Sequence, residues 1–199
     1  MTNPSYDKVA KTFHWLIALA ILGMLALGWT MGDAPNGPGK SALYGLHKSI
    51  GIAILLLSLL RLGWRLAHSA PPMPSAMKTW EKALARIVHG LLYVLMIGIP
   101  LSGWAMVSTS SRNFPTVLFG LVPLPHLPII STLANKQEIN EFAHESHELL
   151  AYGMVALLVL HVAAALKHHW IDRDDVLTRI APRIFTGFLD KLRCAKTGA

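Results

Sequence analysis

Four long apolar runs dominate the sequence and restrict what it can fold into. They cover about 13–31, 45–66, 86–107 and 146–168, and each is bounded by charged residues, Pro or Gly. Each run comes close to the roughly 20 residues that a helix needs to cross the hydrocarbon core of a bilayer. Apolar runs of this length predict helices rather than strands. The sequence therefore predicts an all-α integral membrane protein, a four-helix up-down bundle.

The composition agrees with a membrane protein. Of the 199 residues, 53% are hydrophobic and 15% are charged, and the mean hydropathy is +0.44. A soluble domain usually carries about 25% charged residues. The single cysteine, Cys194, excludes a disulfide framework within the chain and a cysteine-based metal site, and no C-x-x-C-H motif for covalent haem attachment is present. We interpret the first apolar run as a retained helix, because no small-residue cleavage site follows it.

The basic residues indicate the orientation in the membrane. The net charge is +7, but the Lys and Arg residues form no stripe with interleaved aromatics, which argues against a nucleic-acid partner. Fourteen of the 18 lie in the N-terminal segment, the loop between the second and third runs, the C-terminal tail and the adjoining helix ends. By the positive-inside rule, both termini are expected in the cytoplasm. Four lie on the opposite side: Lys40, Lys48, Arg112 and Lys136.

Two further features concern the third run and the segment after it. Pro100 lies inside the third run and predicts a kink there. The segment at about 108–142 is apolar and contains four prolines. We expect it to be a loop that packs against the membrane surface without crossing it.

Five of the ten histidines lie at two depths within the apolar runs, while His168 ends the fourth run. The five are His14, His47, His89, His147 and His161. Ionisable side chains in membrane helices are costly and usually functional. His147 and His161 are 14 residues apart, so they share nearly the same helix face at a separation of about 21 Å. Imidazole also suits zinc or copper. However, apart from Glu148 at the start of the fourth run, the spans place no carboxylate or thiolate beside these histidines, which favours two bis-histidine haem b groups.

Spacing pairs some of these histidines and leaves others open. On the outer side His47 is expected to pair with His147, because His144 is rotated away from the face that His147 shares with His161. On the inner side His14, His89 and His161 compete, and depth alone slightly favours His14 with His89. The residues by themselves do not choose the inner pair.

Short motifs spread over nearly the whole chain are F-H-W at 13–15, L-H at 46–47, R-L-x-x-R-L at 61–66, H-G-L-L-Y at 89–93, P-L-S-G at 100–103, S-H-E at 146–148, L-H-x-A-A-A-L-x-H-H at 160–169 and L-x-R-I-x-P-R at 177–183. Together these motifs resemble the bacterial cytochrome b561 family of four-helix dihaem membrane proteins. The resemblance implies a dihaem cytochrome b membrane domain over 1–183, followed by a basic cytoplasmic tail over 184–199.

The resemblance also implies roles for individual residues. It pairs His14 with His161 and His47 with His147 as axial ligands of the two haem irons, and it leaves His89 as a residue near a propionate or a quinone. It suggests Arg61 and Arg65 as propionate partners of the inner haem, and Lys48 as a partner of the outer one. His168 matches the family position near the quinone.

One subgroup of the family acts as superoxide:ubiquinone oxidoreductases. The resemblance therefore implies a multi-pass protein of the bacterial inner membrane that transfers electrons from a periplasmic donor, superoxide, to ubiquinone. The four outer cations would steer the superoxide anion toward the outer haem. The first alternative is a haem b electron-transfer subunit that serves a periplasmic dehydrogenase or another redox partner. The second is a histidine-rich metal transporter.

Overall fold

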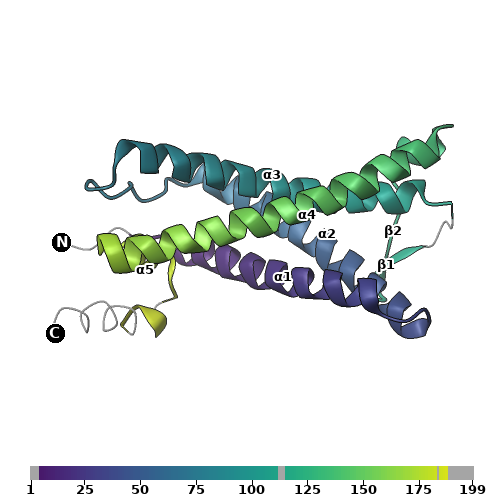
Figure 1. The fold of residues 1–199 in the computed structure, drawn as a ribbon, viewed down its shortest axis with the longest axis horizontal. Coiled ribbons are helices and arrows are strands. Elements are labelled where there is room, and N and C mark those ends of the chain that lie inside the picture. The colour runs from purple at the N-terminus through teal and green to yellow at the C-terminus, as the bar shows by residue number, and fades with distance from the viewer. Residues whose placement is uncertain (1–4, 112–114, 183, 188–199) are drawn as a thin grey trace.

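The computed structural model describes residues 5–111, 115–182 and 184–187. Four of its helices are long and apolar enough to cross a membrane, which confirms the predicted all-α membrane bundle (Figure 1). The last of them continues into a π-helical turn, η2, and a short helix, α5, follows. The bounds are α1 (Lys8–Asp33), α2 (Pro38–Ala67), α3 (Thr79–Thr109), α4 (Lys136–Lys167), η2 (His168–Asp172) and α5 (Val176–Ile180).

The helices follow one another in an up-down order. A turn at 34–37 joins α1 to α2, and the closest helix pairings are α1 with α2, α2 with α3, and α3 with α4. Short connections of this kind make consecutive helices antiparallel neighbours. In Figure 1 the four helices extend along the long axis of the molecule, and α5 lies at the end where α1 begins.

Hydrogen bonds tie the two ends of the described chain together. The indole Nε1 of Trp15 donates to the Ile180 carbonyl oxygen at 3.0 Å, and Lys11 Nζ donates to the Ala181 carbonyl oxygen at 3.0 Å. Ser5 Oγ donates to the Arg179 carbonyl oxygen, also at 3.0 Å. The start of α1 and the segment around α5 therefore lie at the same end of the bundle. The cytoplasmic location of this end stays a prediction, and residues 188–199 of the expected tail lie outside the described residues.

Each predicted apolar run lies inside a helix, but the helices extend further. The largest error is at α4, which begins at Lys136, ten residues before the predicted start at 146 and inside the predicted loop. The added turns are polar, so hydropathy does not detect them. These turns are nevertheless stable as helix. Glu138 lies in the first turn, where the helix dipole favours an anion, and the Gln137 side chain donates to the Glu141 carboxylate one turn later at 3.1 Å.

The segment between α3 and α4 contains a small hairpin that the sequence interpretation missed. Strands β1 (Thr116–Leu118) and β2 (Val122–Leu124) pair antiparallel, and a 3-10 turn, η1 (Ile130–Thr132), follows. Phe119 and Gly120 at the tip both have positive φ, 52° and 73°, as a tight hairpin turn requires. The Phe119 N–H donates to the hydroxyl of buried Ser49 at 2.9 Å, which fixes the hairpin to α2.

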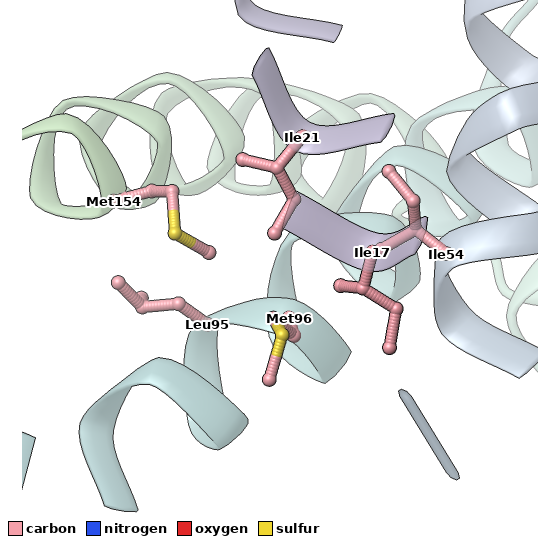
Figure 2. Close-up of a cluster of buried hydrophobic side chains, with 6 residues drawn as sticks. All are labelled: Ile17, Ile21, Ile54, Leu95, Met96 and Met154. Carbon is pink, nitrogen blue, oxygen red and sulfur yellow. The ribbon is translucent and has the colours of Figure 1, made fainter. Parts of the chain in front are cut away.

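The core joins all four long helices at mid-depth. Its members are apolar side chains that point toward one another in Figure 2. Met154 lies seven residues from both His147 and His161, so this core separates the two levels of histidines. Inside a bilayer such contacts stabilise by van der Waals packing rather than by the hydrophobic effect. The buried cluster consists of Ile17 and Ile21 from α1, Ile54 from α2, Leu95 and Met96 from α3, and Met154 from α4.

The outer faces of the helices are apolar as well. Leu19, Leu60 and Val159 are more than half exposed, with relative accessibilities of 64%, 61% and 65%. Such side chains suit contact with lipid, because hydrocarbon is as apolar as they are. The bundle therefore needs few buried side chains, and most of its apolar surface faces outward.

Candidate functional site

At the end of the bundle near the hairpin, two histidines from different helices face each other. His47 on α2 and His147 on α4 have ring centroids 6.1 Å apart, with an angle of 62° between the ring planes. Both side chains are half-buried, whereas His144, one turn before His147, is exposed. The structure thus brings together the outer pair that the sequence predicts and leaves His144 outside it.

Helix α3 holds the ring of His147. Its Nδ1 lies 3.0 Å from the Ile99 carbonyl oxygen and 3.0 Å from Ser102 Oγ, and that hydroxyl donates to the same carbonyl at 2.8 Å. Because a carbonyl oxygen can only accept, Nδ1 carries the proton and Nε2 keeps its lone pair. A Cβ atom at Gly103 would lie 3.2 Å from His147 Cε1, so the ring lies directly against the α3 backbone. The P-L-S-G motif at 100–103 was noted in the sequence, but its contact with His147 was not predicted.

The partner ring of His47 has a different environment. Its Nδ1 is buried and has no hydrogen-bond partner among the described residues. A Cβ atom at Gly28 on α1 would lie 4.0 Å from His47 Cε1, which is ordinary contact. A buried ring nitrogen without a partner is costly, and a buried neutral imidazole is a good metal ligand. These properties suit a residue that binds a metal.

At the other level three histidines come together. The ring centroids of His14 on α1 and His161 on α4 are 6.3 Å apart, and those of His89 on α3 and His161 are 5.4 Å apart. The side chains of His14 and His161 are half-buried, whereas that of His89 is exposed. The three histidines that the sequence left open as inner ligands therefore lie together. Which two of them form the inner pair stays a prediction.

The predicted cationic partners occupy different surroundings. Arg61 is half-buried, its Nη2 lies 3.1 Å from His14 Nδ1, and its guanidinium carbon lies 5.6 Å from the centre of the Tyr93 ring. Arg65, one turn further on α2, is exposed, and Lys48 is half-buried beside His47 in the chain. Among the described residues, no hydrogen bond or ion pair joins Arg65 or Lys48 to another side chain.

A polar cluster lies at the end of α4, where the helix becomes the π-helical turn. The Nδ1 of buried His168 lies 2.7 Å from Asp174 Oδ2 and 3.0 Å from Asp172 Oδ2. Lys167 Nζ lies 2.7 Å from Asp172 Oδ2 and 2.5 Å from Oε1 of Glu81, near the start of α3. His168 follows His161 by two helical turns on the same face, about 10 Å along the axis. The carboxylates were missed from the sequence, although three acids near His168 could have been a signal.

The two histidine pairs fit bis-histidine haem binding. A ligating imidazole nitrogen lies about 2 Å from its metal, and the ring centroid lies about 1 Å further out. Two rings that bind one ion from opposite sides would therefore have centroids about 6 Å apart. The separations of 6.1 Å and 6.3 Å match this value, and 5.4 Å for the pair of His89 with His161 is shorter. A metal-ligating histidine commonly donates its other N–H to a carbonyl, as His147 does.

Comparison with known proteins relates nearly the whole chain to one group. A family model described as prokaryotic cytochrome b561 matches residues 5–183. Among curated proteins, the chain is 36% identical to "Cytochrome b561 homolog 2" of Escherichia coli (strain K12), over 90% of this chain and 92% of that protein. It is 26% identical to "Cytochrome b561 homolog 1" of the same strain, over 89% and 97% of the two chains. It is 29% identical to "Probable superoxide oxidase CybB" of Yersinia pestis, over 91% and 98%.

Proposed function

The chain belongs to the prokaryotic cytochrome b561 family, and on that premise we propose that it oxidises superoxide at the periplasmic face and reduces ubiquinone near the cytoplasmic face. It is a multi-pass protein of the bacterial inner membrane, and its family implies b-type haem and electron transfer. The observation that carries the proposal is the presence of two facing histidine pairs, with ring centroids 6.1 Å and 6.3 Å apart, at two levels of one bundle.

The proposed ligands are neutral imidazoles from three helices. His47 and His147 would hold the outer haem b, and His14 and His161 the inner one. Two haem irons that each carry two histidines supply one-electron redox chemistry without an open coordination position. His147 and His161 are fourteen residues apart, which sets the two levels about 21 Å apart along α4. That spacing supports two redox centres in series across the membrane.

Cationic side chains at each level suit the carboxylates of haem. If His14 binds iron through Nε2, its Nδ1 must carry the proton and can no longer accept from Arg61. The Arg61 guanidinium would then be available to a propionate, a strong bidentate partner. Arg65 is exposed one turn away and would take a second carboxylate of the inner haem. Lys48, half-buried beside His47, would serve the outer haem in the same way.

Reduction of ubiquinone also requires protons, because two superoxide ions, one quinone and two protons give two dioxygen molecules and one quinol. His168 supports this role, since its Nδ1 faces the carboxylates of Asp172 and Asp174 and its Nε2 remains for a quinone oxygen. The chain of contacts continues through Lys167 to Glu81. We propose that His168 delivers a proton to the quinone, with His89 as a further contact near the quinone or a propionate.

Cations near the opposite end support an anionic donor. Lys40 lies on the first turn of α2, where its Nζ donates to the Gly32 carbonyl oxygen at 3.2 Å, and Lys136 begins α4. Arg112, the fourth predicted cation, lies outside the described residues. Positive charge around an entry point raises the rate at which an anion arrives. We propose that Lys40, Lys48 and Lys136 attract superoxide.

Stopped-flow mixing of the purified protein with superoxide tests this function. We expect reduction of the haem absorption on mixing, reoxidation when a ubiquinone analogue is present, and no reduction when superoxide dismutase is added. Failure of superoxide to reduce a protein that dithionite does reduce would exclude superoxide as the donor. That result would favour a haem subunit that serves a periplasmic dehydrogenase. A purified protein without a reducible haem spectrum but with bound zinc or copper would indicate the metal transporter instead.

A further inference from the structure

Helix α3 carries neither of the proposed ligands of the outer haem, yet it forms hydrogen bonds with one of them, His147. Three residues within five positions of α3 face the ring of His147. They are Ile99 with its carbonyl oxygen, Ser102 with its hydroxyl, and Gly103, whose missing Cβ leaves room for the ring. The first two lie 3.0 Å from Nδ1, and Ser102 also donates to the Ile99 carbonyl oxygen. We call these three residues the α3 cradle.

Each member of the α3 cradle restricts the ring in a different way. The Ile99 carbonyl oxygen accepts the Nδ1 proton and so selects the tautomer whose Nε2 can bind a metal. The Ser102 hydroxyl donates its proton to that carbonyl oxygen. Its own oxygen can therefore act only as a second acceptor for the Nδ1–H of His147. Gly103 provides the space, because a Cβ atom there would lie 3.2 Å from Cε1 and 3.4 Å from Nδ1 of His147.

At the inner level the described residues place no such acceptor behind a proposed ligand. The Nδ1 of His14 lies 3.1 Å from Nη2 of Arg61, and a guanidinium can donate but not accept. No hydrogen bond to a ring nitrogen of His161 is present among the described residues. The two levels therefore differ in polarity, with an acceptor behind one outer ligand and a positive charge beside one inner ligand.

We propose that the α3 cradle positions His147 and makes the outer haem the lower in potential of the two. This inference rests on the proposed assignment of two bis-histidine haems. An acceptor on Nδ1–H raises the basicity of a ligating imidazole, which favours the oxidised metal and lowers its reduction potential. In the proposed arrangement two arginines, Arg61 and Arg65, meet the carboxylates of the inner haem and one lysine, Lys48, those of the outer haem. The greater positive charge at the inner level raises the potential there. An electron that enters at the outer level then moves downhill toward the inner level, in the direction that quinone reduction needs.

Equilibrium redox titration followed by visible absorption tests the α3 cradle. The outer haem is observed alone in the His161→Ala background and the inner one alone in the His147→Ala background. We expect the outer potential to lie below the inner one. Ser102→Ala and Gly103→Ala should raise the outer potential or release the outer haem, with a change in its low-spin paramagnetic resonance spectrum and no change at the inner haem.

Two further variants separate positioning from general stability. Ser102→Thr keeps the hydroxyl and should retain the native outer potential. Ser108→Ala removes a hydroxyl that bonds to an α3 carbonyl in the same way but contacts no proposed ligand, and it should leave both potentials unchanged. If Gly103→Ala does not fold, Ser102→Ala decides alone.

Two results would overturn the inference: an outer potential that Ser102→Ala leaves unchanged, or a wild-type outer potential above the inner one. A wild-type protein with fewer than two haems would instead contradict the proposed function itself.

Discussion

Replacement of His161 by Ala should reduce the haem content from two groups per chain to one, whereas His89→Ala should leave both in place. The inner level holds three histidines. The ring centroids of His14 and His161 lie 6.3 Å apart, close to the about 6 Å that two ligands on one iron require, whereas those of His89 and His161 lie 5.4 Å apart. His89 is exposed, unlike the other two. The measurement is the ratio of haem, by its pyridine haemochrome spectrum, to protein.

Both substitutions are mild for the helix, because Ala has the highest helix propensity and each histidine lies inside a long helix. A loss of haem in His161→Ala can therefore be assigned to the ligand rather than to unfolding, which far-ultraviolet circular dichroism verifies. His14→Ala should behave as His161→Ala does. Retention of both haems in His161→Ala, together with a loss in His89→Ala, would establish His14 and His89 as the inner pair.

Replacement of His147 by Ala should remove the outer haem and with it the response to superoxide. Loss of a hydrogen bond to a metal ligand typically lowers affinity by about 10- to 100-fold, and loss of the ligand itself should cost more. We expect superoxide to reduce this variant at least about 100-fold more slowly than the wild type, because losing a ligand should cost at least as much as losing its hydrogen bond. A quinol should still reduce the remaining inner haem, since the cluster around His168 is unchanged. Stopped-flow absorption with each reductant measures the two rates.

His144→Ala is the matched control, because His144 lies one turn earlier on α4 and its side chain is exposed. It should keep two haems and the wild-type response to superoxide. If His144→Ala lost the outer haem while His147→Ala kept it, the outer assignment would be wrong. If His147→Ala lost the haem but superoxide still reduced the protein at the wild-type rate, the donor would enter at the inner level.

The sequence predicted the helices well because lipid imposes a simple requirement. Every predicted apolar run lies inside a long helix, since a segment in hydrocarbon must satisfy its own backbone hydrogen bonds. Outside the bilayer this requirement ends. The polar turns from Lys136 onward were assigned to a loop for that reason. The hairpin was missed because prolines lie inside it and beside it, at Pro123, Pro115 and Pro125, and argue against strands. Its turn at Phe119 and Gly120 depends on left-handed backbone conformations, and no sequence motif indicated them.

For the candidate site, too, the features set by the geometry of a single helix could be predicted from the sequence, and the contacts between helices could not. The shared face of His147 and His161 follows from the period of one helix, and the facing of His47 with His147 follows from depth. The choice among the inner histidines needed a family resemblance, because three helices converge there at one level. The contact of Ser102 with His147, and that of Lys167 with Glu81, join different helices and depend on their rotation in the bundle. Spacing along one chain carries no information on that rotation.

The most direct test of the central claim is the haem content and spin state of the purified wild-type protein. We expect two haem b groups per chain, both low-spin with the paramagnetic resonance signature of two axial imidazoles. One haem per chain, a high-spin iron with an open position, or zinc or copper in place of haem would contradict it.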